Sequence, residues 1–590
     1  MAKRHQDRLN IRDVLDMLDN DDSDIDDGDD SNSDEDDEYV VPQSDNSNAE
    51  DTSDDDLSKE EDTPLSSLAT SKKDRRQYRW MKKDFDPPDL TFTGDPLSQP
   101  VLDAKGQPQT PLQYFRRFIT YDMIETIVVF TNQYAVQKFG NSVNTTVKEI
   151  EQILGIVIRM GLVQMSGIRV YYEEDTRYGP VADVMSRNRL QLLLRSIHFV
   201  DNESASEDVK TDKLWKIRPF LEKFRAQCLL VIPEEKQSID EMMVPFKGRF
   251  SHIKQYLRGK PNPWGFKIWC RCSIDGMLHD FDVYQGKSAD RGQISELGVA
   301  GDVVRKLGET LPRHKNYKVF ADNLFTSVEL LEKMQKDGFQ YTGTVRANRL
   351  RGCELMSEKE LNKSGRGSFD FRVEQKTNIV CVRWMDTKMV TLMSTSAGIH
   401  PLDKARRWDK SAKEHKDVNR PFIVKEYNSN TGGIDLLDSC TARYKFSLKA
   451  RRWYMYLFWH FIQLAVINGW LWYRRDCKQL GIEKPLILRK FQGRVASGLV
   501  SVNAARNRGR PAAEQSPSSR PTSPVPHPPR KVRLHPNDDA RKDQYAHWPV
   551  KIDKRRRCAV CQIKTDTNCE KCLVPVCFTE NRNCFKEFHA

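Results

Sequence analysis

The sequence lacks the features of a secreted protein and of a polytopic membrane protein. Its first ten residues, MAKRHQDRLN, contain no apolar signal core. Seven of the thirteen cysteines are scattered without a pairing pattern, and no second candidate membrane span accompanies the one long uncharged segment. Hydrophobic residues make up 38% of the chain, which also fits a wholly disordered protein poorly. We therefore expect a folded protein in a reducing compartment.

The long uncharged segment runs from Trp453 to Tyr473 and is 21 residues long, enough to cross a membrane. Polar side chains lie near its middle, at His460, Gln463 and Asn468, and its apolar residues are mostly aromatic rather than aliphatic. These features favour a buried core helix, with a membrane helix as the alternative.

Basic residues are almost absent from residues 13–62, where 24 Asp and Glu stand against the single Lys59. This region carries a charge of −23, which leaves +33 for the rest of a chain whose net charge is +10. A body this basic should attract a polyanion such as DNA. The acidic region is either a solvated tail or a segment that shields the basic body from non-specific DNA.

Changes in composition and periodicity divide the 590 residues, a length typical of roughly four domains. Helical spacing of apolar residues, with Asp183 and Ser186 as candidate helix starts, gives way near residue 238 to three strand-type runs, a helix and a fourth strand, which indicate a mixed α/β sheet. The predicted segments are a disordered acidic region (1–110), a helical domain in two parts (111–235 and 443–500), an α/β core in two parts (236–346 and 422–442), a β-rich insertion (347–421), a Pro/Ser/Arg-rich linker (501–546) and a cysteine-rich domain (547–590).

Four aspartates occupy positions where a strand or helix end would expose them: Asp240, Asp322, Asp435 and Asp438. Carboxylates that converge from separate segments repel one another unless cations lie between them, and two Mg²⁺ ions would provide the clamp for in-line displacement at phosphorus. Each motif also has an ordinary explanation, because Asp is favoured at helix starts and Asp-Asn in turns. Spacing alone does not assemble them into one site. Glu241 should point to the opposite sheet face from Asp240.

A series of motifs carries a family resemblance. In chain order they are SIDEMMVPFKGR, YLRGKPNPWGFKIW, ADNLFTS, TGTVRAN, YNSNTGGIDLLD and KARRWYMYLFW. The chain resembles piggyBac-type transposases and piggyBac transposable element-derived proteins from about residue 111 to its C-terminus, apart from the Pro-rich linker.

The resemblance implies a ribonuclease H-like core of the DDE/D class, a helical dimerisation and DNA-binding domain on both sides of it, and cut-and-paste DNA transposition at TTAA targets. Asp240, Asp322 and Asp435 match the three catalytic aspartates, and Asp438 matches an additional aspartate beside the metal site. We expect Asp240 and Asp322 to bind Mg²⁺, Asp435 to complete the site and Asp438 to support it.

Several basic residues are candidate DNA contacts, for reasons of charge and spacing. Arg451, Arg452 and Trp453 combine phosphate-binding charge with a stacking ring, although a core Trp453 beside solvated arginines explains them equally well. Arg508 and Arg510 belong to an AT-hook-like Arg-Gly-Arg-Pro. The remaining candidates lie after the first core strand: Lys247, Arg249, Arg258 and Lys260.

The C-terminal cysteines indicate zinc binding, because each tetrahedral ion needs four Cys or His donors and so small a region has little core of its own. The candidate ligands are Cys558, Cys561, Cys569, Cys572, Cys577, Cys584 and His589, with His547 as the eighth. The family's cysteine-rich domain is similar, a two-zinc cross-brace that binds the terminal inverted repeat. A RING or histone-tail reader is the rival interpretation. The basic run 554–557 is either a nuclear import signal or a phosphate-binding patch.

The sequence as a whole predicts a nuclear, homodimeric, Mg²⁺-dependent DNA transposase that acts on terminal inverted repeats and has neither a membrane partner nor a small-molecule substrate. One alternative is a domesticated, transposase-derived DNA-binding protein without catalytic activity. A second is a zinc-dependent protein-interaction module.

Overall fold

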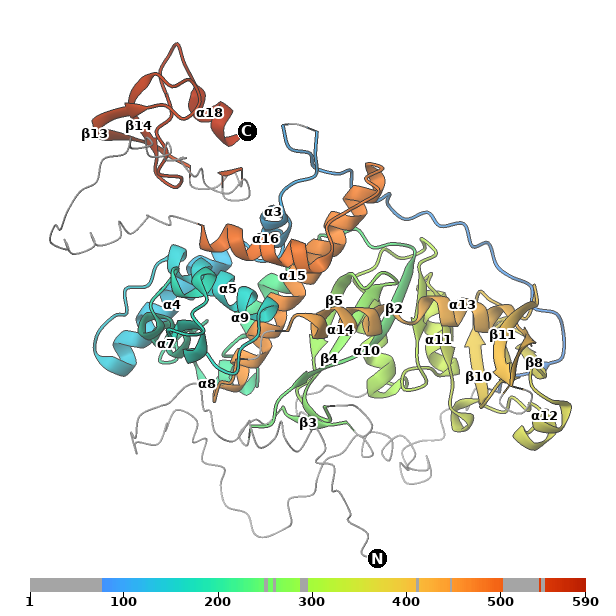
Figure 1. Ribbon diagram of the computed structural model, residues 1–590. Coiled ribbons are helices and arrows are strands. Elements are labelled where there is room, and N and C mark those ends of the chain that lie inside the picture. The colour runs from blue at the N-terminus through green and yellow to red at the C-terminus, as the bar shows by residue number, and fades with distance from the viewer. Residues whose placement is uncertain are drawn as a thin grey trace, which may run out of the picture. The chain divides into compact units, whose positions relative to one another are not determined.

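The computed structural model describes residues 77–104, 106–248, 253–257, 262–286, 295–409, 413–445, 448–501, 541–542 and 547–590. These described residues divide into two compact units, the first within residues 1–99 and 199–472 and the second within residues 100–198 and 473–590 (Figure 1). The acidic region 13–62 and most of the predicted linker 501–546 lie outside the described residues.

The first unit contains a mixed sheet, as the sequence predicts, and this sheet has ten strands. Its order is β1-β8-β9-β10-β7-β6-β2-β4-β3, and β5 also pairs with β4. The neighbours β2, β6 and β7 are parallel, whereas the other pairs are antiparallel. The strands are β1 (Trp80–Met81), β2 (Lys236–Pro245), β3 (Gln255–Tyr256), β4 (Trp264–Ser273), β5 (Leu278–Val283), β6 (Lys318–Ala321), β7 (Gln340–Thr344), β8 (Phe369–Glu374), β9 (Val380–Met385) and β10 (Met389–Ser394).

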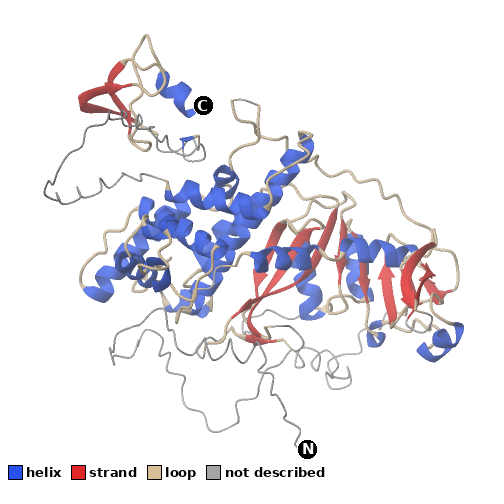
Figure 2. Ribbon diagram, in the orientation of Figure 1, coloured by secondary structure: helices blue, strands red, loops and turns tan. Residues whose placement is uncertain are grey.

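Helices flank the strands of this unit (Figure 2). Alternate side chains of the central strands, among them Ile239 and Val319, pack with Val304 and Leu331 of two helices in one apolar cluster. The helices of the unit are α8 (Glu207–Thr211), α9 (Arg218–Leu229), α10 (Gly298–Gly308), α11 (Val328–Lys336), α12 (Glu358–Ser364), α13 (Phe422–Asn430), α14 (Gly433–Arg443) and the start of α15 (Trp453–Gln479), with a 3-10 turn η2 (Ala347–Arg349).

The long uncharged segment is a buried core helix within α15, as predicted. The Asn468 side chain bonds to the backbone of Leu278 in both directions: its Nδ2 donates to the carbonyl at 2.9 Å, and its Oδ1 accepts from the N–H at 3.1 Å. The ring of Phe461 packs 4.6 Å from that of Phe281. Among the described residues, no helix has the length and apolarity needed to cross a membrane.

Two boundaries of the first unit differ from those predicted. The sequence predicts disorder for residues 77–104, but β1 pairs with β8 in this region. Further along the chain, Phe85 packs against the apolar cluster that contains Val373 and Val382, and the ring of Phe92 packs edge-on against that of Tyr317. The strands of the predicted insertion continue the core sheet, because β10 pairs with β7. The hairpin β11 (Asp403–Asp409) and β12 (Glu414–Arg420) forms a separate two-stranded sheet.

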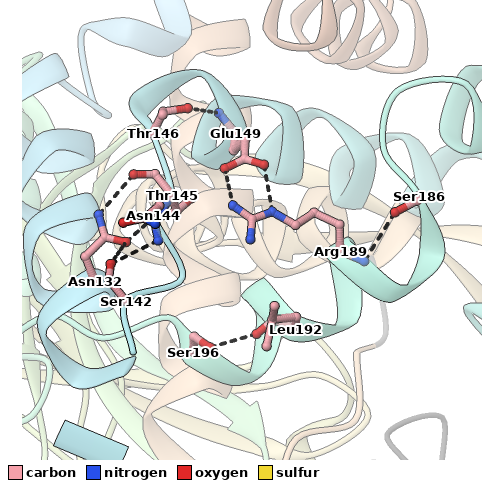
Figure 3. Close-up of polar contacts among 10 residues, drawn as sticks. All are labelled: Asn132, Ser142, Asn144, Thr145, Thr146, Glu149, Ser186, Arg189, Leu192 and Ser196. Atoms are coloured by element: carbon pink, nitrogen blue, oxygen red, sulfur yellow. Dashed lines mark hydrogen bonds and ion pairs between the residues drawn. The ribbon is translucent and has the colours of Figure 1, made fainter. Parts of the chain in front are cut away.

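The second unit holds a helical part in which side chains cap the starts of α5 and α7 (Figure 3). The Thr146 hydroxyl accepts from the Glu149 N–H at the start of α5, and Ser186 caps α7 in the same way, as the sequence predicts. Glu149 and Arg189 join these helices through bonds of 2.8 and 2.7 Å. Asp183, the other candidate start, instead ends α6. The helices are α3 (Pro111–Arg116), α4 (Tyr121–Phe139), α5 (Val147–Leu162), α6 (Gly179–Ala182), α7 (Arg187–Ser196), the end of α15 and α16 (Leu488–Val500), with a 3-10 turn η1 (Arg169–Tyr172).

The predicted helical domain therefore does not form one body. Its segment 199–235 and most of α15 belong to the unit that contains the sheet. The rings of Phe224 of α9 and Phe461 of α15 lie 6.0 and 4.6 Å from the ring of Phe281 on β5, so aromatic side chains join both helices to the sheet.

The C-terminal module comprises the hairpin β13 (Pro549–Arg557) and β14 (Lys564–Cys569) and the helix α18 (Cys584–His589). Its buried cluster is small and consists mostly of cysteines, with Val576 and Phe588 as its apolar members. A core this small offers little stabilisation by apolar burial alone.

Candidate active site and metal-binding module

The strand register places two of the predicted aspartates beside each other. Ile239 of β2 lies opposite Ala321 of β6, which lies opposite Gly343 of β7. The next row along these parallel strands is therefore Asp240, Asp322 and Thr344. Residues in one row point to the same sheet face.

The face on which this row lies is covered by the segment that joins α13 to α14. The Ser238 hydroxyl, two residues before Asp240 on the same face, donates to the carbonyl of Thr431 at 2.6 Å. The carboxyl ends of parallel strands are where α/β sheets commonly bind ligands.

The two aspartates are half-buried, and the charge of Asp322 shifts Asp240 toward its neutral form. Burial, with the charges of Glu241 and Asp322, raises the pKa of Asp240 to about 8. Burial also raises the pKa of Asp322, and Glu241 adds to that shift while Arg346 and Lys267 oppose it. A pair of carboxylates whose ionised forms are disfavoured in this way is suited to a cation that would offset their repulsion.

Glu241 also lies near the pair, contrary to the expectation from strand alternation. Its charge raises the pKa of both aspartates. The reason is local: Oδ1 of Asp240 accepts a hydrogen bond from the Glu241 N–H at 2.8 Å, which turns the Asp240 carboxylate along the strand toward the next residue. Strand alternation predicts the direction of Cβ but not such a turn.

The helix α14 carries Asp435 and Asp438 and begins close to the sheet. Gly432 is its N-cap, and a Cβ on Gly433 would lie 2.5 Å from the carbonyl oxygen of Ser273, so only glycine permits this approach. The predicted helix start is thus present.

The carboxylates of α14 differ in their surroundings. Asp435 is exposed in the first turn. Asp438 is half-buried, and its charge opposes the lowering of the Lys445 pKa that burial causes. In the described ranges, sets of three or more donor atoms within 4.8 Å of one another occur only in the C-terminal module. The structure therefore brings Asp240 and Asp322 together and leaves Asp435 and Asp438 on the adjoining helix.

The sequence analysis did not single out Tyr427 of α13, which faces the same aspartates. Its phenol group interacts electrostatically with Asp322 and Asp240, and burial raises its pKa. It lies in the same YNSNTGGIDLLD motif as Asp435. Its place in the same motif as Asp435 is the sequence feature that could have indicated a position near the site.

The predicted DNA contacts have varied surroundings. Trp453 is half-buried and packs 6.0 Å from the ring of Phe266, as in the core interpretation, and the guanidinium of Arg452 lies 5.5 Å from the ring of Tyr454. Arg451 and Lys247 are exposed. The other predicted contacts lie outside the described residues: Arg249, Arg258, Lys260, Arg508 and Arg510.

The C-terminal module gathers all eight predicted zinc ligands into two sets of four. One set is His547, Cys569, Cys572 and His589, and the other is Cys558, Cys561, Cys577 and Cys584. The donor atoms of each set lie within 4.8 Å of one another, and the two sets alternate along the chain. This interleaving is the expected cross-brace arrangement.

The chemistry of both sets fits zinc, which prefers four Cys and His donors. In one set, Nδ1 of His589 donates to the carbonyl of Phe585 at 2.7 Å, which leaves Nε2, 3.4 Å from the Cys572 sulfur, available to a metal. A carbonyl that fixes the tautomer in this way is the usual partner of a metal-binding histidine. The hydrogen position is assigned from this contact.

A mixed sheet with two half-buried aspartates side by side, where the parallel pairing of β2 with β6 ends, fits a ribonuclease H-like fold. A solved structure supports this class: the cryo-EM structure of a piggyBac transposase synaptic complex with hairpin DNA matches with a TM-score of 0.58 and 22% identity, over 84% of this chain and 98% of that one. At this identity the likeness establishes the fold alone.

Sequence comparisons establish the family. The model DDE_Tnp_1_7, described as Transposase IS4, matches residues 110–470. The human piggyBac transposable element-derived proteins 3 and 2 are each 31% identical, over 516 and 520 residues, which is 87% of this chain and 81% of each relative. The chain therefore belongs to the family of piggyBac transposases and piggyBac transposable element-derived proteins.

Proposed function

We propose that this chain is a DDE/D-class DNA transposase that cuts and rejoins DNA at TTAA sites. The observation that carries the proposal is the position of Asp240 next to Asp322, where the parallel pairing of β2 with β6 ends, in a chain of a transposase family. Two acidic groups that share a half-buried position, where burial and neighbouring carboxylates disfavour ionisation, are more typical of a catalytic site than of a turn.

The aspartates fit magnesium, which proteins commonly hold through one or two carboxylates together with substrate phosphates. In the proposed site Asp240 and Asp322 bind the metal pair, Asp435 completes the site from α14, and Asp438 supports it. When bound, two such ions activate an attacking oxygen and stabilise a leaving one. The exposed position of Asp435 in the first turn of α14 leaves its carboxylate accessible to an incoming DNA phosphate and its counter-ions.

The proposed reaction is phosphoryl transfer, in which water and then a 3′-hydroxyl attack a DNA phosphate. The sheet register supports this role, because it holds Asp240 and Asp322 at fixed positions in one row on one face. Positioning of this kind supplies much of the rate enhancement in phosphoryl transfer.

For the C-terminal module we propose two structural zinc ions and recognition of the terminal inverted repeat. The eight gathered donors and the exposed basic strand residues 554–557 support the proposal. We also propose a nuclear homodimer that uses Lys247, Arg451 and Arg452 among its DNA contacts. Support comes from the basic body of the chain and from the solved relative, which is a synaptic complex with hairpin DNA.

A second candidate function is DNA binding without cleavage, favoured by the names of the human relatives, which describe them as transposable element-derived. Excision from a donor plasmid distinguishes the two. The plasmid carries a marker between the genomic segments that flank the source gene, each with its TTAA, and the assay contains Mg²⁺. We expect excision by the wild type and none by Asp240→Asn. The control Asp282→Asn should excise normally, because Asp282 of β5 forms an ion pair with Lys306 at 2.8 Å.

Undiminished excision by Asp240→Asn refutes the catalytic assignment. Binding of the flanking DNA with no excision by the wild type favours the second function. Binding of histone-tail peptides by the C-terminal module in place of DNA would instead favour the protein-interaction interpretation.

A further inference from the structure

The hairpin of β11 and β12 presents one of its two faces to solvent. On its inner face, Ala405 and Val418 are buried, and Val418 packs in the apolar cluster of Val373 and Val382. The side chains of the other face, the outer face, are all exposed. They form three register pairs: Lys404 with Asn419, Arg406 with Asp417, and Trp408 with His415. The hairpin therefore packs on the sheet unit through its inner face and leaves the outer face uncovered.

The cations of the two faces differ in their partners. Those of the inner face are neutralised by carboxylates: Arg407 by Asp386 at 3.0 Å, Lys416 by Asp409 at 2.7 Å and Arg420 by Asp403 at 2.6 Å. Lys404 and Arg406 of the outer face form no ion pair with any residue that the structure describes, although Asp417 lies opposite Arg406. Residues 403–420 contain seven Lys and Arg against four Asp and Glu. The outer face thus offers positive charge to a partner.

Trp408 adds an aromatic ring to the same face. It is 51% exposed, and its ring meets that of His415 at 5.1 Å and an interplanar angle of 72°, so the two rings do not stack face to face. The backbone beneath it is fixed, because the Trp408 carbonyl accepts a hydrogen bond from Arg366 at 3.2 Å. On the other strand, the Asn419 carbonyl accepts one from Trp384 at 2.9 Å. A ring held in this way loses little freedom when it binds a partner.

The order of these residues fits a nucleic-acid strand. Lys404, Arg406 and Trp408 are alternate residues of one strand and follow one another at intervals of about 6.6 Å. Phosphates attract the two cations, and an unpaired base stacks on the ring. A paired base cannot offer its face, because its neighbours in the duplex cover it. An acidic protein segment would use the two charges but not the ring, so single-stranded DNA is the partner that uses all three side chains.

The hairpin is connected to the candidate active site by a single helix. β12 leads through Pro421 into α13, and Thr431, directly after α13, accepts a hydrogen bond from Ser238 of β2. The nine residues of α13 span about 14 Å, roughly the rise of four nucleotides in one DNA strand. A strand held at Asp240 and Asp322 therefore needs to extend only several nucleotides to reach the base of the hairpin.

We propose that the outer face of the β11–β12 hairpin binds a single-stranded segment of DNA, with Trp408 stacked on a base and Lys404 and Arg406 in contact with phosphates. The inference rests on the proposed function, which supplies the DNA, and it adds a second contact for that substrate. Its tests measure binding and require no cleavage.

The first test is photo-cross-linking of the full-length protein to oligothymidylate that carries one central 5-iodouracil. This base cross-links to an aromatic ring stacked on it, and the strand contains no TTAA. We expect a cross-link to the peptide that contains Trp408, identified by mass spectrometry. The same strand annealed to oligoadenylate should give no cross-link there. No cross-link from the single strand, or an equal one from the duplex, overturns the proposal.

The second test measures the affinity for the same single strand over a series of salt concentrations. Trp408→Ala should weaken binding roughly 10-fold, the contribution of one stacked base, while Trp408→Phe retains most of the affinity. The double variant Lys404→Ala, Arg406→Ala should reduce the slope of log affinity against log salt by about 1.4, the effect of two lost phosphate contacts. All these side chains are exposed, so the melting temperatures should match that of the wild type.

The matched control is Lys388→Ala. Lys388 is an exposed cation between β9 and β10, outside the hairpin, so its loss should leave both the cross-link and the affinity nearly unchanged.

The outcomes separate this inference from the transposase proposal. If Trp408→Ala and the double variant bind the strand like the wild type, the outer face has another occupant and the inference is wrong, whatever the excision assay shows. A loss of affinity in the double variant alone overturns the stacking contact and the inference with it. If Asp240→Asn still excises, the transposase proposal fails, and the cross-link and the affinities decide the role of the hairpin by themselves.

Discussion

A network of buried charged residues around Asp280 should contribute strongly to the free energy of unfolding of the sheet unit. Asp280 of β5 is fully buried and accepts four hydrogen bonds: two from Arg225 at 2.6 and 3.1 Å, one from Thr310 at 2.8 Å and one from the Phe281 N–H at 2.8 Å. Its neighbour across the strands, Arg271, is also buried, and burial lowers the pKa of its guanidinium to about 10 while the charge of Asp280 opposes that shift.

Replacing Asp280 with alanine should cost about 3–5 kcal/mol, the usual cost of removing one partner from a buried ion pair, because the guanidinium of Arg271 stays buried without its nearest counter-charge. The hydrogen bonds of Arg271 do not replace that charge, because its acceptors are neutral: the Leu307 carbonyl at 3.0 Å, Gln237 Oε1 at 2.8 Å and Thr310 Oγ1 at 3.0 Å. Asp280→Asn keeps part of the hydrogen bonding and should cost less.

The assay is urea unfolding of the full-length protein followed by tryptophan fluorescence. Asp282→Ala is the matched control, because Asp282 lies two residues further along the same strand and forms a partly exposed ion pair with Lys306, worth about 0–1 kcal/mol. The reasoning is refuted if Asp280→Ala lowers the free energy of unfolding no more than Asp282→Ala does.

Three further predictions follow from the site, the module and the core. Without Mg²⁺, Asp240→Asn should raise the melting temperature at neutral pH. The folded-state pKa of Asp240, about 8, lies above its unfolded value, so the wild type loses stability as the pH rises from about 4 to about 8. An increase in melting temperature that does not shrink toward pH 5 contradicts this. Metal analysis of the full chain should find two zinc ions, both retained by Cys353→Ser, whose residue is buried in the sheet unit; one ion or none contradicts the two sets. Asn468→Leu should lower the free energy of unfolding in urea by about 2–4 kcal/mol, because it leaves the N–H and the carbonyl of Leu278 without the hydrogen bonds that Asn468 provides. An unchanged free energy of unfolding would contradict this prediction.

The order of elements could be predicted from the sequence, but their pairing could not. Alternating apolar residues indicate each strand by itself, whereas the row of Asp240 and Asp322 depends on β2 and β6 pairing in parallel across about 80 residues of chain. The same limit explains the insertion: the pattern of β8 to β10 predicts strands, but only their partner, β7, shows that they extend the core sheet.

The zinc ligands illustrate how far residue chemistry reaches. Cys and His at these spacings predict the eight donors, because few other roles call for so many in so short a segment. Their division into two alternating sets depends on how β13, β14 and α18 fold back on one another, which spacing does not determine.

The position of α14 is the remaining question for the site, and two adjacent glycines allow it to be tested. A Cβ on Gly433 would lie 2.5 Å from the carbonyl oxygen of Ser273, whereas one on Gly432 would meet nothing within 4 Å. The added methyl group would meet a backbone oxygen, which cannot rotate away as a side chain can. Gly433→Ala must therefore displace the start of α14 from β4, together with Asp435 and Asp438, at a cost of about 1–3 kcal/mol.

Gly432→Ala adds the same methyl group one residue earlier and should cost about 1 kcal/mol at most, through its effect as the N-cap. If Asp435 completes the metal site, Gly433→Ala should therefore reduce plasmid excision far more than its loss of stability explains, while Gly432→Ala excises almost normally. Equal excision by the two variants, at matched folded fractions, would mean that the placement of Asp435 does not limit the reaction. The catalytic assignment would then rest on Asp240 and Asp322 alone.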